Sequence, residues 1–284
     1  MSKALTAWIE GIGFLAPGLP DWPTARAVLR GEQAYAPAPS VLPAPSILPP
    51  AERRRASRVV KLTLAVGREA AAHAGADVGQ LATVFSASGA DGHNCHALCE
   101  QLAGEDRQIS PTRFHNSVHN AAAGYWGIAT GAMAPCQVIC AYDASFGAGL
   151  LDALGQVVVD RQTTLLIAYD SEYPQPLFAK RPVPDVAGVG LVLAPQRTER
   201  SLAQITVAPD TANAEPLADA DMLTEVDMGD WKPSDKAETK FSLACSYYKL
   251  ELDGLLIYEI DPIASVRIVD GRDQLADIRA ALGL

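Results

Sequence analysis

Short apolar runs alternate with segments of helical periodicity along the first two thirds of this 284-residue chain. Runs with the length of buried strands lie at 7–14, 81–86, 137–141, 163–168, 186–193 and 202–207. Helices are expected between them, because apolar residues recur there three or four positions apart. The alternation predicts an α/β fold, with a mixed, mostly parallel sheet and helices on both of its faces.

The longest predicted helix begins after Pro49 and Pro50, a pair suited to a helix start, and ends at Gly75. Shorter helices are expected at roughly 95–102 and at 146–159. Residues 37–50 hold six prolines in fourteen positions, which excludes a continuous helix or a central strand. This segment is therefore expected to be an ordered or semi-rigid loop.

The character of the chain changes near residue 208, where acidic residues and isolated polar runs become common. We therefore expect one domain at 1–207 and a C-terminal extension at 208–284. Short strands at 254–260 and 265–269 and a final helix at 273–282 would make the extension a small α+β appendage. Its sequence matches no family that we can place, and its role is left open.

Composition excludes several classes of protein. The net charge of −10 and the pI near 4.9 argue against general binding to nucleic acid, which needs surplus Lys and Arg. No apolar stretch reaches the roughly 20 residues of a membrane span, and the first residues lack the pattern of a secretory signal. Five cysteines without such a signal indicate reduced thiols. We expect a soluble, cytoplasmic protein.

Several segments resemble the β-ketoacyl synthases of the thiolase superfamily. The likeness is carried by residues 110–124 (SPTRFHNSVHNAAAG), by the strand-to-helix segment 138–154, and by residues 173–185, and it extends from about Leu5 to about Val207. It implies a thiolase-like half-fold. It is greatest to short ketosynthase-like proteins of aryl polyene, xanthomonadin-like and dialkylresorcinol pigment pathways, some of which resemble the chain-length factor of type II polyketide synthesis.

The family carries a cysteine nucleophile at the strand-to-helix turn and two histidines from its second half. Alignment without gaps places Asp143 where that cysteine should stand, and a carboxylate cannot carry an acyl thioester. No histidine follows His119 in the sequence. The resemblance therefore implies a degenerate site without catalytic residues, in a subunit that lacks the second half of the fold and does not condense acyl groups alone.

Two other residues could replace the missing nucleophile. Cys140 is expected inside the strand, as a small buried residue, and Ser145 would need a neighbouring base. Asp143 and Ser145 are more typical of helix N-caps. An active acyltransferase or thioesterase that uses Ser145 or Cys140 is the alternative hypothesis.

The cluster of His93, Cys95, His96 and Cys99 could suggest zinc, but it is one compact run without a second ligand pair. A helix with ordinary buried thiols fits it better. We expect neither a metal nor a cofactor.

The resemblance also implies a pocket or a subunit interface. Its expected residues are Phe114, His115, Asn116, Ser117, His119, Asn120, Tyr125, Trp126 and Phe146. A half-fold should leave apolar surface exposed, and Phe114, Tyr125 and Trp126 could be its aromatic anchors. The expected partner is a full-length β-ketoacyl synthase, in a heterodimer or a higher assembly. A self-associating acyl-binding scaffold is the other alternative.

A basic run stands out in this acidic chain. Arg53, Arg54, Arg55 and Arg58 lie close together at the start of the long helix. Most such runs are solvated helix faces. These arginines could instead dock an acidic partner, either the ketosynthase or an acyl carrier protein.

Overall fold

A computed structural model describes residues 4–89, 91–105, 107–207, 248–252, 255–261, 266–269 and 272–273. The contacts divide the chain into two compact units, Met1–Pro209 and Asp210–Leu284. Each unit is described by itself.

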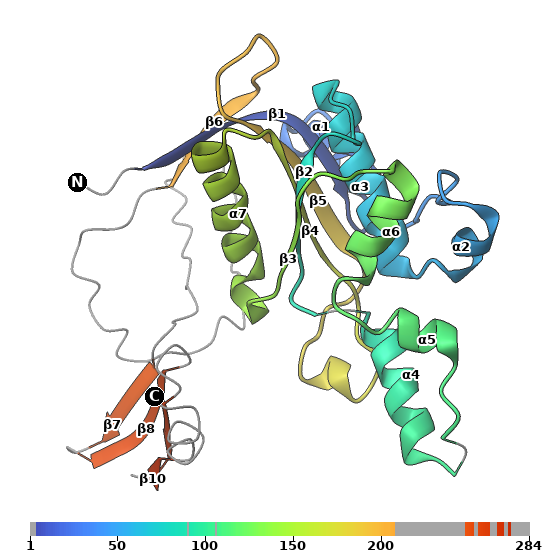
Figure 1. The fold of residues 1–284 in the computed structure, drawn as a ribbon, viewed down its shortest axis with the longest axis vertical. Coiled ribbons are helices and arrows are strands. Elements are labelled where there is room, and N and C mark those ends of the chain that lie inside the picture. Colours follow the sequence, from blue (N-terminus) through green and yellow to red (C-terminus); the bar gives the residue numbers. More distant parts are fainter. Residues whose placement is uncertain are drawn as a thin grey trace. The chain divides into compact units, whose positions relative to one another are not determined.

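The first unit is built on a six-stranded mixed sheet (Figure 1). Its strands are β1 (Leu5–Leu15), β2 (Ala82–Ser86), β3 (Cys136–Ile139), β4 (Thr164–Asp170), β5 (Ala187–Ala194) and β6 (Ala203–Val207). They lie in the order β3-β2-β4-β5-β1-β6. The predicted α/β class and mixed sheet are confirmed. Only β2 pairs in parallel, with β3 and β4, whereas β4–β5, β5–β1 and β1–β6 are antiparallel, so parallel pairs are not the majority.

Helices cover both faces of this sheet. They are α1 (Trp22–Leu29), α2 (Pro50–Arg55), α3 (Arg58–Ala74), α4 (Gly92–Ala103), α5 (Pro111–His115), α6 (Ala121–Thr130) and α7 (Ser145–Gly155). Helices α3 and α6 lie on one face and α7 on the other (Figure 1). Short helical turns occur at η1 (Tyr142–Ala144), η2 (Gln156–Asp160) and η3 (Leu177–Ala179).

Helix α3 is the centre of the larger core. Ten of its 17 residues are buried, and it packs on β1, β4 and β5. Glycines let it approach the sheet: a Cβ at Gly13 or Gly190 would collide with the backbone oxygen of Val66. Gly75 ends the helix in the left-handed conformation, as predicted.

Helix α7 packs over the other face, where its Leu154 joins a smaller cluster with Val84 and Leu166 of the sheet. Only four of its eleven residues are buried. Gly149 lies against Ser86 of β2, where a Cβ on the helix would collide with the serine side chain.

The proline-rich segment is an ordered loop, as predicted, and it is fixed at several points. Ser40 donates its backbone N–H to Asp185 at 2.6 Å and its hydroxyl to the carbonyl of Val186 at 2.9 Å. Leu48 is buried in the main core. The loop therefore belongs to the compact unit.

Two predicted helices are interrupted. The helix expected from residue 51 breaks at Ala56, whose backbone is extended, so that α2 and α3 are separate. The helix expected over 146–159 ends at Gly155 and continues as the π-helical turn η2. Periodicity does not reveal either break, because apolar residues continue through η2 at similar spacing.

The described part of the second unit is an antiparallel sheet in the order β10-β9-β8-β7. Its strands are β7 (Tyr248–Leu252), β8 (Leu255–Asp261), β9 (Val266–Val269) and β10 (Arg272–Asp273). Strands β8 and β9 match the two predicted strands, whereas β7 was not predicted. The helix predicted at 273–282 lies almost wholly outside the described residues. Across the described ranges, no helix combines the length and apolar character that a membrane span requires.

Candidate functional site

Polar residues follow the parallel strands β3, β2 and β4 at the edge where each strand ends. Cys140 follows β3, Ser88 and Asp91 follow β2, and Asp170 ends β4. Ligands of open α/β sheets bind outside the carboxyl ends of such strands. This edge is therefore the candidate site, and it has two parts: the strand-to-helix turn 140–145 and a polar pocket beside it.

The turn between β3 and α7 is held by Ser145. The Ser145 hydroxyl donates to the carbonyl of Tyr142 at 2.6 Å and accepts from the Ala141 N–H at 2.9 Å. Ser86 donates its hydroxyl to the Ser145 carbonyl at 2.5 Å. Ser145 is buried, and its hydroxyl fixes the turn through two bonds to backbone groups, whereas a nucleophilic serine needs a base as its hydrogen-bond partner.

The prediction that Asp143 and Ser145 are N-caps is wrong. The cap position of α7 is Ala144, without a side-chain hydrogen bond. The Asp143 carboxylate instead accepts from Nη2 of Arg181 at 2.8 Å. A preceding helical turn, η1, already carries the chain into α7, so no side chain is needed there.

Tyr142 has the strained conformation of the turn, with φ of 52°. Its ring lies under the guanidinium of Arg181, whose Cζ is 3.9 Å from the ring centroid. The Nε and Nη1 atoms of Arg181 are buried without a partner among the described residues. Tyr142, Asp143 and Arg181 therefore close the place where a nucleophile elbow would present its reactive atom.

Cys140 is exposed and not buried in the strand, so the expectation of a core thiol is wrong. The strand ends at Ile139, and the Cys140 sulfur lies 3.4 Å from the carbonyl oxygen of Ser88. Ser88 also donates its N–H and hydroxyl to Asp170. Burial raises the pKa of Asp170, although these hydrogen bonds and Arg181 oppose the rise. These contacts provide no cation to stabilise a Cys140 thiolate.

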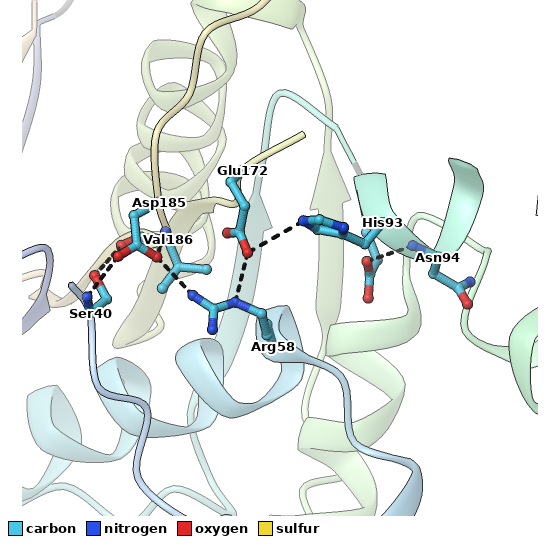
Figure 2. Close-up of polar contacts among 8 residues, drawn as sticks. Ser40, Arg58, His93, Asn94, Glu172, Asp185 and Val186 are labelled. Atoms are coloured by element: carbon cyan, nitrogen blue, oxygen red, sulfur yellow. Dashed lines mark hydrogen bonds and ion pairs between the residues drawn. The ribbon is translucent and has the colours of Figure 1, made fainter. Parts of the chain in front are cut away.

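The second part of the site is an ion network around Arg58 (Figure 2). Its Nε lies 2.8 Å from Glu172, and its Nη2 lies 2.7 Å from Asp185. Asp185 also accepts from the backbone of Ser40 and Val186. Burial would raise the pKa of Asp185, but these hydrogen bonds and Arg58 lower it. The network joins the start of α3, the proline-rich loop and the segment after β4.

His93 approaches the same network from α4, with Nε2 at 3.5 Å from Glu172 (Figure 2). Asp91 caps α4 by accepting from the Asn94 N–H at 3.0 Å. A cavity of about 240 Å³ lies here, lined by Arg58, Asp91, His93, Asn94, Arg113, Ser171 and Glu172.

The run of His93, Cys95, His96 and Cys99 does not converge on one point. His93 faces Glu172, whereas His96 pairs with Glu100 one turn along α4. Cys95 is half-buried and Cys99 is exposed, so the thiols are not the buried pair that was expected. Within the described ranges, no group of three His, Cys, Asp or Glu side chains is placed to hold a metal ion.

The expected pocket or interface residues fall into two groups. Asn116, Tyr125 and Trp126 are buried; Tyr125 donates to Asn116, and Trp126 packs edge-on against Phe85. Tyr125 and Trp126 therefore belong to the core and cannot be aromatic anchors for a partner. The exposed group consists of Phe114, His115, Asn120 and Phe146, with Ser117 and His119 half-buried.

Exposed apolar side chains gather on the segments that precede and follow the edge strand β3. Eight of the fourteen exposed large apolar residues of the described ranges lie here: Phe114, Val118, Ile128, Met133, Tyr142, Phe146, Leu151 and Val159. We call this set the β3 flank. Strand β3 has β2 on one side and is the end strand of the sheet. Helix α7 packs against β3, so its exposed Phe146 and Leu151, with the end strand of the sheet, are suited to contact with a protein partner.

The basic run is only partly available for docking. Arg53 donates to the carbonyls of Ser46 and Leu48, and Arg58 is held by its two carboxylates. Arg55 pairs with Glu52 at 3.4 Å. Arg54 and Arg55 are exposed on α2 and remain the candidates for a docking role.

The sheet order, the helices on both faces and the strand-to-helix turn define a thiolase-like α/β half-fold. Residues 27–238 match the family described as beta-ketoacyl synthase, N-terminal domain. The match covers most of the sequence, and the chain belongs to this family.

Solved structures share the fold. The complex of the ketosynthase ApeO with its chain length factor ApeC from Xenorhabdus doucetiae gives a TM-score of 0.57 at 24% identity, over 68% of this chain and 80% of that chain. The ishigamide ketosynthase/chain length factor gives 0.54 at 17%, over 67% and 62%. A beta-ketoacyl synthase from Burkholderia phymatum gives 0.52 at 15%, over 68% and 59%. Part of each of the last two chains therefore has no counterpart here.

The C-terminal extension has a different likeness, one that the sequence reading did not place. Residues 219–283 match the family described as phage tail tube protein FII. The tail tube protein of Escherichia phage P2 is 38% identical over 60 residues, which is 21% of this chain and 35% of that protein. The chain thus spans about a third of the relative's length.

Sequence reasoning missed the residues that close the turn and build the ion network. Arg181, Glu172 and Asp185 lie in the segment between β4 and β5, far in sequence from Asp143 and Arg58. The available signal was that Arg181 and Asp185 lie within the family-like stretch 173–185, with Glu172 directly before it.

Proposed function

We propose that this chain is a non-catalytic, chain-length-factor-like subunit that pairs with an active β-ketoacyl synthase in carrier-protein-bound synthesis of polyketide or fatty-acid type, aryl polyene pigments among them. The observation that carries the proposal is the closed turn. Asp143 is bound by Arg181, Ser145 uses its hydroxyl in the backbone of the turn, and the Tyr142 ring stacks against the Arg181 guanidinium. None of these three side chains is placed to accept an acyl group.

The surface of the unit supports pairing. The β3 flank holds Phe114, Ile128, Phe146 and Leu151 in solvent, on the segments that come before and after an edge strand in the sequence. Exposed apolar residues around an open edge favour either a partner or aggregation. A subunit of this family with a degenerate turn can use such a surface to bind a second subunit that retains the catalytic residues. An acyl carrier protein would meet the exposed arginines Arg54 and Arg55.

The test is native mass spectrometry of this chain co-expressed with the full-length ketosynthase encoded nearest to it. We expect a stoichiometric complex whose condensation activity requires the partner's cysteine and tolerates Asp143→Ala. Phe114→Asp should weaken the complex at least tenfold, because it places a charge in an apolar interface. Leu29→Asp is the matched control: Leu29 is exposed on α1, outside the β3 flank, and its change should leave the complex intact.

Two results would contradict the proposal. One is the absence of a complex while the chain alone is monodisperse. The other is turnover of acyl thioesters by the chain alone, lost in Cys140→Ala; this would support the acyltransferase or thioesterase alternative. Ser145→Ala is less informative, because the buried hydroxyl also fixes the turn.

A second candidate function rests on the C-terminal extension. Its likeness to a phage tail tube protein favours a self-associating scaffold, in which residues 219–283 link copies of the chain. Native mass of the chain alone at rising concentration tests this. Assemblies larger than a dimer that persist in Phe114→Asp would support it, whereas a monomer at all concentrations would exclude it.

A further inference from the structure

We propose that the polar pocket at the carboxyl edge of the sheet binds a small α-amino acid as its zwitterion. The pocket is the cavity of about 240 Å³ that lies beside Arg58, Arg113 and Glu172. Two arginines and two carboxylates line it, and a third carboxylate, Asp185, binds Arg58, so the pocket has no surplus positive charge for a simple anion. A small ligand that carries one charge of each sign matches this lining.

Three side chains of the pocket can accept hydrogen bonds from the ammonium group of such a ligand. Glu172 has one carboxylate oxygen, Oε2, that is buried without a partner among the described residues. Asp91 is 9% exposed, and its cap on α4 uses only Oδ1. Ser171 is 6% exposed, and its hydroxyl makes no hydrogen bond within the described ranges. An ammonium group has three donors, and pairing them with buried acceptors removes the free-energy cost of leaving those acceptors unpaired.

The carboxylate of the ligand pairs with Arg113. Arg113 lies on α5, is exposed, and makes no ion pair within the part of the chain that the structure describes. A guanidinium can hold a carboxylate through two parallel hydrogen bonds. Arg58 is less suited to this role, because Glu172 and Asp185 already hold it at 2.8 Å and 2.7 Å.

The ion network fixes the acceptor side of the pocket before a ligand arrives. Arg58 binds Oε1 of Glu172 and also binds Asp185, which accepts from the backbone of Ser40 (Figure 2). Glu172 is therefore held in place while its Oε2 stays unpaired, and groups that are already oriented lower the entropy cost of binding. Arg113 has no such support, so its side chain is the one expected to order on binding.

The test is isothermal titration of the full-length chain with L-alanine and with two smaller probes that each lack one of its charged groups. Propionate lacks the ammonium group, and ethylamine lacks the carboxylate. We expect saturable binding of L-alanine. Each of the other two probes should bind at least tenfold more weakly, because each leaves one charged side of the pocket unpaired.

Two variants test the two sides of the pocket separately. Arg113→Gln should weaken binding of L-alanine about tenfold and leave binding of ethylamine unchanged, since ethylamine has no carboxylate. Ser171→Ala should weaken both severalfold, because it removes an acceptor for the ammonium group without changing charge. Arg30→Gln is the matched control, since it removes the same charge as Arg113→Gln from the end of α1, outside the pocket.

Three outcomes would overturn the proposal. They are the absence of saturable binding of L-alanine, binding of propionate or ethylamine as tight as that of L-alanine, and equal losses of affinity in Arg113→Gln and Arg30→Gln. The titration uses this chain alone, so its result does not depend on whether a complex with a ketosynthase forms. Failure of this proposal and failure of the proposed function are therefore distinguishable.

Discussion

Helices α3 and α7 cover opposite faces of the same sheet, but they are buried to different extents. Helix α3 buries ten of 17 residues, whereas α7 buries four of eleven and leaves Phe146 and Leu151 in solvent. The difference indicates which face stabilises the unit and which face is available to other molecules. The α3 side is the unit's own core, and the side of α7 and β3 offers apolar surface that folding alone does not use.

The largest expected effect tests the α3 side. Leu62→Ala should destabilise the first unit by about 2–5 kcal/mol, since Leu62 is fully buried and its loss leaves a cavity. Leu151→Ala on α7 should change the free energy of unfolding by about 0.5 kcal/mol or less, because Leu151 is exposed. Urea denaturation followed by tryptophan fluorescence measures both. Equal losses of unfolding free energy in the two variants would show that the two faces do not differ in this way.

On the α7 side, the stability of the unit should depend on one polar side chain, that of Ser145. Ser145→Ala should cost about 1–3 kcal/mol, because it leaves the partly buried N–H of Ala141 and carbonyl of Tyr142 without their partner. Ser117→Ala is the matched control, since Ser117 makes one exposed hydrogen bond to Phe114. The same denaturation measurement applies. A neutral Ser145→Ala would show that the turn does not depend on this hydroxyl.

Acid should destabilise the α3 side of the unit by protonating Asp185. Its pKa is lowered in the fold, so its contribution is complete above the ordinary pKa of Asp and is lost as pH falls through the lowered value. Asp185→Asn should therefore cost about 1–2 kcal/mol at pH 7, and the difference from wild type should shrink toward pH 2. Denaturation across pH checks this. Asp143→Asn should cost only about 0–1 kcal/mol at pH 7, because its ion pair with Arg181 is partly exposed.

The smallest effect concerns thiol reactivity and leaves stability unchanged. Cys136 and Cys140 are exposed beside β3, whereas burial, with Asp91 and Cys99, raises the pKa of Cys95. A thiol reagent at pH 7.5 should label Cys136 and Cys140 before Cys95, as peptide mass mapping would show. Bound ketosynthase should protect the first two and leave Cys95 unchanged. Uniform protection, or none, would argue against the β3 flank as the interface.

The sequence predicts the parts of this molecule that depend on local periodicity. Apolar runs place β2, β4 and β5 within one or two residues, and Gly75 ends α3 as expected. These features follow from spacing and from the one residue type that tolerates a left-handed turn. The family likeness likewise identifies the turn at Asp143.

The rest depends on contacts between distant residues. Sequence could not reveal that Arg181 covers Tyr142, because a loop brings the two together. Nor could it distinguish a buried Trp126 from an exposed Phe114, since both are aromatic residues in or just after the same family-like stretch. Cys140 is exposed one residue beyond the end of β3, and Cys136 is exposed within the strand, because β3 is the end strand of the sheet.

The glycines under α3 have an evolutionary consequence. Gly13 and Gly190 place strand backbone directly beneath the helix, so the spacing of the two layers is set by main chain and not by side chains. In most cores, a larger side chain at one position can be accommodated by a smaller side chain at a neighbouring position. A methyl group added at Gly13 or Gly190 cannot be accommodated in this way, because it meets main-chain atoms. A saturation mutagenesis library should therefore tolerate apolar residues of similar volume at Leu62 and Val66 while it rejects even alanine at the two glycines.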